Sequence, residues 1–186
     1  MPTTIFTNAL GTNRSDSQVS FRDVLPITAG AQSQVRVTFT SGTGSALRLD
    51  NASIGIQSST YITTATPVEL LFSGAHGFTV GPNASITSDW VNFTGFTSSD
   101  KLVVIMDYNS AGGEASSDQS SPAGVTLYYL FGNNPSYNIA DPTSLGSWGN
   151  VPWAIGVALI ETQATGGGPP IRGPFDTRDH QPMVAQ

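Results

Sequence analysis

Two histidines, His76 and His180, are the side chains best suited to moving protons at neutral pH in this sequence. His76 lies in SGAHGF, a glycine-flanked turn, and His180 lies in TRDHQP, close to a proline. A serine hydrolase brings a serine, a histidine and an acid together, often with the serine in a G-x-S-x-G turn. Neither histidine lies near such a turn, so the sequence predicts no catalytic triad.

Carboxylates are the second group that could do chemistry, because a pair about 5 to 9 Å apart can cleave glycosides. Spacing along this chain does not place two of them together, and most aspartates stand at strand ends, where turn hydrogen bonds explain them. Asp50-Asn51 and the stretch 107–109 come nearest to a calcium site, but no D-x-[DN]-x-[DN]-G run occurs. Cysteine is absent, which excludes cysteine-ligated metals. We expect no enzyme, no metal and no cofactor.

Aromatic side chains are the remaining candidates for holding a ligand, because they can stack on sugar rings. Trp90 and Trp153 stand in strand-like runs, where packing in the core is the better interpretation. Tyr137 and Trp148 lie in a long stretch with Gly, Asn and Pro neighbours, where exposure and burial are equally expected. Tyr137 and Trp148 are therefore the candidate glycan-binding residues.

Charge is scarce in this chain: 11% of its residues are charged, and its net charge is −6. The seven basic residues are scattered, so no basic stripe could neutralise phosphates, and we expect no nucleic-acid binding. The chain has a single lysine, which argues against binding to anionic membrane surfaces. No apolar run approaches the roughly 20 residues of a membrane span. The N-terminal residues lack the charged and apolar regions of a signal peptide.

The elements that position these side chains are short β-branched and aromatic runs between Gly, Pro and Ser/Thr breaks. Residues 34–40 alternate, with Val35, Val37 and Phe39 on one face. Residues 101–108 are apolar on both faces, as in a central strand. The run 46–57 changes face, which indicates a bulge or turn at 50–53. The last run, 151–161, places Trp153, Ile155, Val157 and Leu159 on one face.

About nine or ten such runs predict an all-β fold, an antiparallel β-sandwich that resembles a jelly roll. We expect the sandwich over residues 18–162, after an N-terminal extension at 1–17. Long loops are expected at 109–123 and 132–150, and loops of this length are usually functional or disordered. Residues 163–186 are so rich in Gly and Pro that they form an extended arm rather than a helix or a ladder strand.

The C-terminal arm has too few apolar residues to offset an ordering cost of about 1 kcal/mol per residue. We therefore expect it to dock on a partner. The alternative is that it folds back on its own sandwich and covers a sheet edge. The docking residues would be Ile171, Arg172, Phe175, Arg178 and Met183.

Five pieces of the stretch from Arg36 to Tyr108 carry a family resemblance: VRVTFTSGTGSALRL, NASIGI, TPVELLFSGAHGFTV, GPNASITSDW and DKLVVIMDY. In this order they resemble the N-terminal β-sandwich, jelly-roll-like module that precedes the catalytic domain in some GDSL/SGNH-type hydrolases. Similar modules occur alone or in phage tail and virion proteins. This chain departs from the enzymes because no GDS nucleophile block and no downstream Asp-x-x-His block follow.

A sandwich without a catalytic block, together with a docking arm, predicts a structural protein of a tailed phage or a similar particle. Within the virion we expect a capsid decoration or spike protein that docks through its termini, with copies of itself and other virion proteins as partners. A tail or baseplate component is the second interpretation. The alternative from another class is a carbohydrate-binding module that recognises host-surface glycans. An accessory domain of a hydrolase on a separate chain is a third idea.

Overall fold

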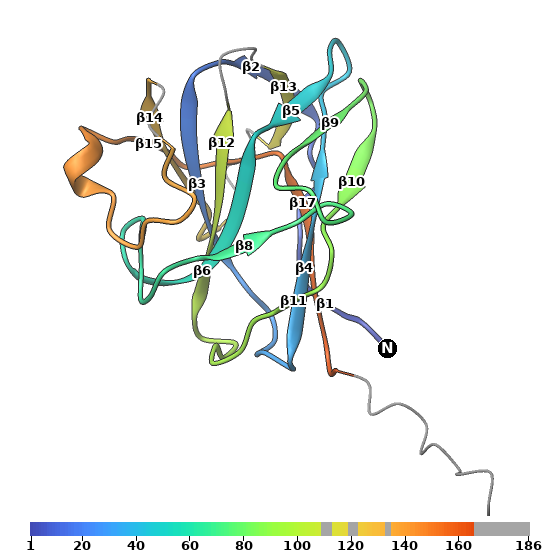
Figure 1. Cartoon of the computed structure of the whole chain (residues 1–186), viewed down its shortest axis with the longest axis vertical. Helices are drawn as coiled ribbons and strands as arrows, with labels where there is room; N and C mark the ends of the chain where they lie inside the picture. The colour runs from blue at the N-terminus through green and yellow to red at the C-terminus, as the bar shows by residue number, and fades with distance from the viewer. Residues whose placement is uncertain (109–112, 119–122, 133–134, 166–186) are drawn as a thin grey trace, which may run out of the picture.

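Antiparallel β-strands make up nearly all the regular structure of the chain (Figure 1). The structure is a computed structural model, and it describes residues 1–108, 113–118, 123–132 and 135–165. Two large sheets face each other, with β3 and β12 on one side and β4 and β17 on the other. This arrangement confirms the predicted all-β sandwich.

The five-stranded sheet has the order β1-β17-β4-β10, and β11 also pairs with β4. Its strands are β1 (Thr3–Thr7), β4 (Gln34–Thr40), β10 (Ser85–Thr87), β11 (Val91–Asn92) and β17 (Val157–Gln163).

The seven-stranded sheet has the order β15-β14-β3-β12-β6-β7, and β8 also pairs with β6. Its strands are β3 (Val19–Pro26), β6 (Asn51–Ser59), β7 (Ile62–Thr63), β8 (Val68–Leu70), β12 (Lys101–Tyr108), β14 (Thr126–Phe131) and β15 (Gly149–Val151).

Two small sheets and one short helix complete the described structure. The order β16-β13-β2 joins β2 (Thr12–Asp16), β13 (Gly113–Asp118) and β16 (Ala154–Ile155), and β5 (Leu47–Leu49) pairs with β9 (Phe78–Val80). A 3-10 helix, η1, spans Thr143–Leu145.

The main core lies between the two large sheets, because alternate residues of each strand point inward. Strand β4 alternates as predicted, with Val35, Val37 and Phe39 fully buried. Strand β12 is buried along almost its whole length, also as predicted, because its outward residues pack in a second cluster. That cluster consists of Val24, Val103 and Ile105, with Tyr128 and Tyr137 packed against it.

Three parts of the sequence-based assignment need correction. The run 151–161 is not one strand: β15 ends at Val151, and a positive φ of 74° at Gly156 separates β16 from β17. The stretch 109–123, expected as a loop, contains β13, which pairs with β2. Residues 1–17, expected as an extension, supply β1 and β2, and Ile5 and Phe6 are buried in the core. The described residues thus hold seventeen strand segments, several of only two or three residues, rather than nine or ten strands.

Both ends of the described chain leave the sandwich at the same place. Strands β1 and β17 are antiparallel neighbours, and Thr3 lies opposite Thr162. The connection 27–33 reaches the same end, where Ser33 donates its N–H to the carbonyl of Gln163 at 3.0 Å. The connection 93–99 joins it there through Ala31 and Phe96, whose N–H and carbonyl pair at 3.0 Å.

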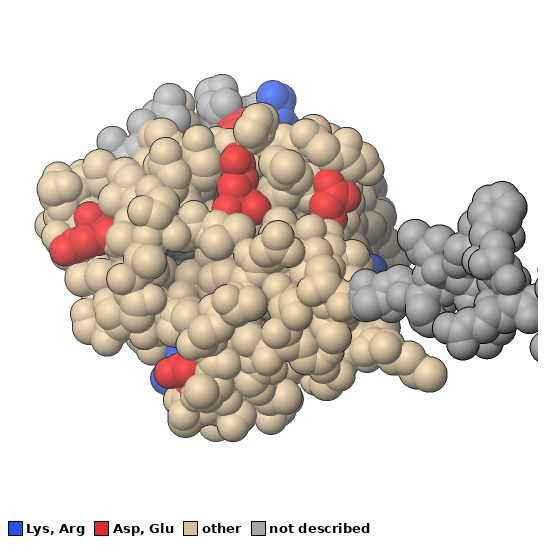
Figure 2. Space-filling model, turned by 60° about the horizontal axis from the view of Figure 1, so that its bottom comes forward, with Lys and Arg blue, Asp and Glu red and all other residues tan. Residues whose placement is uncertain are grey.

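We call this end, formed by residues 1–2, 27–33, 93–99 and 164–165, the neutral pole. None of these residues has a charged side chain. Figure 2 turns this end of the molecule toward the reader, and the few charged atoms in view leave a broad uncharged area.

Among the described residues, no helix has the length and hydrophobicity that a membrane span requires.

Candidate functional site

The loop between β14 and β15 covers the outer face of the seven-stranded sheet, and buried polar groups hold it there. Arg22 points outward from β3 and is fully buried beneath this loop. Its guanidinium donates to the carbonyl oxygens of Tyr61 at 2.9 Å, Ser136 at 2.8 Å and Ile139 at 2.5 Å. A planar guanidinium with five N–H donors can satisfy several carbonyls at once, so Arg22 ties the loop to the sheet.

Asp107, on the neighbouring strand β12, holds the start of the same loop. Its carboxylate accepts the backbone N–H of Ser136 at 2.9 Å and of Tyr137 at 3.0 Å, and the hydroxyl of Ser20 at 2.5 Å. Burial raises the pKa of Asp107, while these hydrogen bonds and the charge of Arg22 oppose the rise. Burial likewise lowers the pKa of Arg22 to about 10, which leaves it charged at neutral pH.

An aromatic platform lies beside this anchor. The rings of Tyr61 and Trp148 stack with centroids 4.9 Å apart and planes 25° apart, and the ring of Tyr128 lies 5.0 Å from that of Tyr61. The Arg22 guanidinium lies 5.7 Å from the Trp148 ring, and the indole N–H donates to the carbonyl of Pro142 at 3.3 Å. All three rings are half-buried, so each keeps some surface for a ligand.

The two candidate glycan-binding residues therefore have different surroundings. Trp148 belongs to the aromatic platform of Tyr61, Tyr128 and Trp148. Tyr137 is also half-buried, but it packs on the outer apolar cluster, and its carbonyl accepts a hydrogen bond from the hydroxyl of Ser53. Tyr61 was not singled out from the sequence, because its contribution depends on the fold placing it against Trp148.

The two tryptophans expected in the core are instead half-buried, and each contacts an arginine. The guanidinium of Arg36 lies 4.5 Å from the Trp90 ring, and that of Arg14 lies 5.3 Å from the Trp153 ring. Both tryptophans lie just outside regular strands, where the chain does not keep the inward alternation. Such pairs keep a ring partly exposed while its face contacts a cation.

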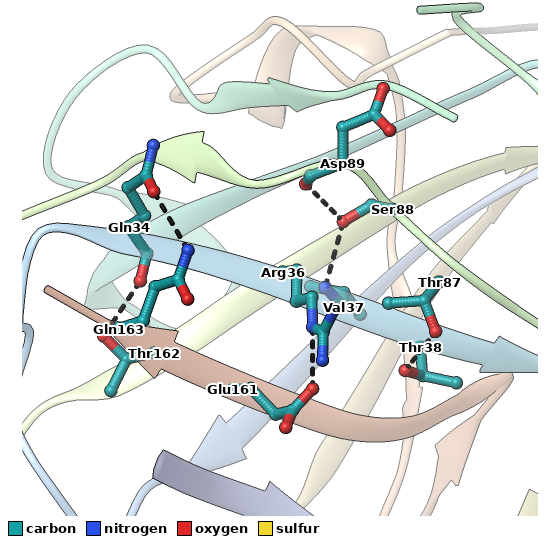
Figure 3. A network of polar contacts seen from close by, with 10 residues as sticks. All are labelled: Gln34, Arg36, Val37, Thr38, Thr87, Ser88, Asp89, Glu161, Thr162 and Gln163. Carbon is teal, nitrogen blue, oxygen red and sulfur yellow. Dashed lines mark hydrogen bonds and ion pairs between the residues drawn. The ribbon is translucent and has the colours of Figure 1, made fainter. Parts of the chain in front are cut away.

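Arg36 also belongs to a polar network on the outer face of the five-stranded sheet (Figure 3). It donates to Glu161 at 2.7 Å, and the hydroxyls of Thr38 and Thr87 pair across the strands at 2.9 Å. Because these side chains already hydrogen-bond one another, the face is polar without carrying an unpaired charge at this point.

A second buried carboxyl, Asp23, lies on the inner face of β3. It accepts the N–H of Ile155 at 3.1 Å, and burial raises its pKa well above the ordinary value. The hydroxyl of Tyr108 is also buried, without a hydrogen-bond partner among the described residues, and burial and the charge of Asp23 raise its pKa. The Tyr108 ring lies 5.1 Å from that of the fully buried Phe21, and the Arg14 guanidinium lies 5.6 Å from the Phe21 ring.

His76 pairs with Glu69 at 2.6 Å on the surface, and the histidine side chain is 70% exposed. Asp89 accepts the backbone N–H of Gly74 at 2.8 Å, so the role of Asp89 is to hold a turn.

No group of three or more His, Asp and Glu side chains that could hold a metal ion occurs among the described residues. His180 and the docking residues Ile171, Arg172, Phe175, Arg178 and Met183 lie outside the described residues.

Comparison with known protein families finds no matching family, and comparison with curated proteins finds no match. The resemblance to the GDSL/SGNH-associated module therefore stays an expectation.

Proposed function

We propose that this protein is a non-catalytic structural component of a virion, from a tailed phage or a phage-like particle, that decorates the capsid or forms a spike and docks through its termini. The observation that carries this proposal is the antiparallel pairing of β1 with β17, which places Thr3 opposite Thr162. Whatever precedes β1 and follows β17 leaves from the same end, so one pole can attach while the rest of the sandwich stays outward.

The chemistry of the neutral pole supports attachment there. Burying a charge in an interface costs several kcal/mol unless it is paired, and this pole has no charged side chain to desolvate. Its hydroxyl and amide groups can exchange water for hydrogen bonds to a partner. The proposed partners are other copies of this chain and other virion proteins, with the arm residues Ile171, Phe175 and Met183 as apolar anchors.

Incorporation into particles tests this proposal. The full chain, expressed with its particle, is expected to band with purified particles at a fixed stoichiometry. Ser98→Glu with Ser99→Glu places charges on the neutral pole, and we expect it to reduce incorporation at least tenfold. Thr79→Glu with Gly81→Glu adds the same charge at exposed positions outside that pole and is expected to incorporate normally. Equal incorporation of both variants, or absence of the chain from particles, would contradict the proposal. Labelling in the electron microscope would separate a head position from a tail or baseplate position.

A carbohydrate-binding module is the second proposal, and the aromatic platform of Tyr61, Tyr128 and Trp148 favours it. Stacked, half-buried rings beside hydrogen-bonding groups offer the flat apolar surface on which a sugar ring packs. A glycan array with the full chain tests this function. Binding that is lost in Trp148→Ala and kept in Trp90→Ala would support it, whereas no binding to any glycan would contradict it.

A further inference from the structure

A groove of about 260 Å³ lies where the two large sheets meet near the neutral pole. Its lining includes Ile56 of β6, Val68 of β8 and Phe93 directly after β11. Among the described residues, β8 pairs only with β6 and β11 only with β4, so each is an edge strand. The groove therefore marks a seam that no strand pairing closes.

The groove's size and lining restrict what can occupy it. Pockets for small organic ligands usually measure about 300 to 1,000 Å³, so this groove of about 260 Å³ falls just below that range and suits one or two side chains of a peptide. Its lining contains no charged residue, and the polar groups are the Asn92 amide and threonine side chains such as Thr66 and Thr94. A peptide segment that inserts one apolar side chain fits this chemistry, provided that a charged neighbour such as Arg172 stays outside the groove.

The chain's own C-terminal segment starts close to the groove. Gln163, at the end of β17, lies opposite Gln34 of β4, which in turn lies opposite Asn92 in the groove lining. Their amides are joined by hydrogen bonds of 3.2 Å each, and Figure 3 shows the bond between Gln34 and Gln163. Two strand spacings of about 4.8 Å place Gln163 roughly 10 Å from Asn92.

The length of the segment matches this distance. Ile171 lies eight positions after Gln163, and a flexible chain of eight residues spans about 16 Å on average. Ile171 and Phe175 are the large apolar residues of the stretch 164–175. Because the tether keeps the segment near the groove, its effective concentration there is of the order of millimolar, well above that of a second copy in dilute solution.

We propose that, in the free protein, the groove holds residues 171–175 of the same chain, with Ile171 or Phe175 inserted between β8 and β11. The segment then covers two sheet edges that would otherwise be open to another chain. This inference goes beyond the proposed function, because it concerns the isolated protein and holds whether or not the chain belongs to a virion.

Limited trypsin digestion tests the inference, because the C-terminal arm has one cleavage site inside the proposed docked stretch and one beyond it. Arg172 lies inside the docked stretch, and Arg178 lies beyond it. Ala65→Trp fills the groove from an exposed position, so it should release the segment without unfolding the domain. We expect the cleavage rate at Arg172, relative to that at Arg178, to rise at least tenfold in Ala65→Trp. The control Thr79→Trp, an exposed site on β9, should leave the ratio unchanged.

Three outcomes would overturn the proposal. The first is a cleavage ratio that is the same in the wild type and in Ala65→Trp. The second is protection of Arg172 that increases with protein concentration, because that would place the segment in the groove of a second copy. The third comes from methyl NMR spectra of the full chain: Ile171→Asp with Phe175→Asp should shift the signals of Ile56 and Val68, and unchanged signals would contradict docking even if Ala65→Trp failed to fold.

Discussion

The guanidinium of Arg22 donates a hydrogen bond of 2.8 Å to the carbonyl oxygen of Ser136, although the two residues are 114 positions apart in the chain. The same guanidinium satisfies the carbonyls of Tyr61 and Ile139. One buried side chain of β3 thus ties the segment that carries Tyr61 and the loop that carries Trp148 to the sheet.

Arg22→Leu is expected to destabilise the fold by about 3 kcal/mol or more, because it leaves buried carbonyl oxygens without a donor. Urea unfolding measures the loss, and hydrogen exchange at the amides of Ser136 and Tyr137 should accelerate as the loop loosens. Arg36→Leu is the control: Arg36 is partly exposed, so losing its pair with Glu161 should cost about 1 kcal/mol or less. A loss in Arg22→Leu no larger than in this control would show that the loop is held by other contacts.

Asp23→Asn should flatten the dependence of stability on pH. Burial raises the pKa of Asp23 in the folded state, so between the unfolded value of about 4 and the folded value the native protein binds the extra proton. Stability from this group is then highest below about pH 4 and falls as the pH rises to the folded pKa, by at most about 1.4 kcal/mol per pH unit. Urea unfolding from pH 4 to 7 should show a shallower fall in Asp23→Asn than in the wild type.

Asp100 is the matched control for this pH series. The N–H and hydroxyl of Thr97 lower the pKa of Asp100, so its contribution has the opposite sign: it is present above about pH 4 and is lost as the pH falls through the lowered folded pKa. Asp100→Asn should therefore leave the fall between pH 4 and 7 unchanged. A wild-type slope that persists in Asp23→Asn would mean that Asp107, whose pKa is also raised, accounts for it.

Gly77→Ala is expected to destabilise the protein, whereas Gly81→Ala is not. A Cβ at Gly77 would lie 2.4 Å from the carbonyl oxygen of Leu49 and 2.5 Å from that of Asp50, both backbone atoms. A Cβ at Gly81 would meet nothing within 4 Å, so alanine there should change stability by less than about 1 kcal/mol. Thermal unfolding of the two variants gives the comparison, and equal midpoints would show that the β5–β9 pair shifts to make room.

Leu102→Ala should cost about 2 to 4 kcal/mol, because Leu102 is fully buried between the sheets and the cavity would stay open. Leu159, on the outer face of β17, is only half-buried, and Leu159→Ala should cost about 1 kcal/mol or less. Chemical denaturation of both variants measures the difference. Similar small losses would mean that the core collapses around the missing side chain.

The positions of the main strands could be predicted because each strand carries its own pattern. The alternation in Gln34–Thr40 and the two apolar faces of Lys101–Tyr108 are local properties, and the structure has both strands at those residues. The change of face in the run 46–57 predicted a bulge or turn at 50–53, and the structure has a shorter break, since β5 ends at Leu49 and β6 begins at Asn51.

Strand partners were not predictable in this way. Strand β13 forms in a stretch rich in Gly and Ser because its backbone pairs with β2, about a hundred residues earlier in the chain. The side chains of this stretch show no pattern from which that pairing could be predicted. Strand β1 belongs to the sandwich because its backbone pairs with the edge of β17. Gly156 divides the last apolar run by adopting a φ that other residues avoid, which the run's hydrophobicity does not reveal.

The residues of the candidate site likewise fall into two groups: those that the sequence indicated and those that only the tertiary structure revealed. Local composition alone singled out Tyr137 and Trp148, and the low charge that leaves one pole neutral is likewise a property of the sequence. In the sequence, Arg22 is only one of seven scattered basic residues. Its role was decided by the path of the chain, because carbonyls from residues 61, 136 and 139 converge on it only after β3, β14 and the intervening loops have packed. Hydrogen-bond partners this far apart in sequence depend on tertiary geometry, since a hydrogen bond needs its atoms within about 3 Å of each other.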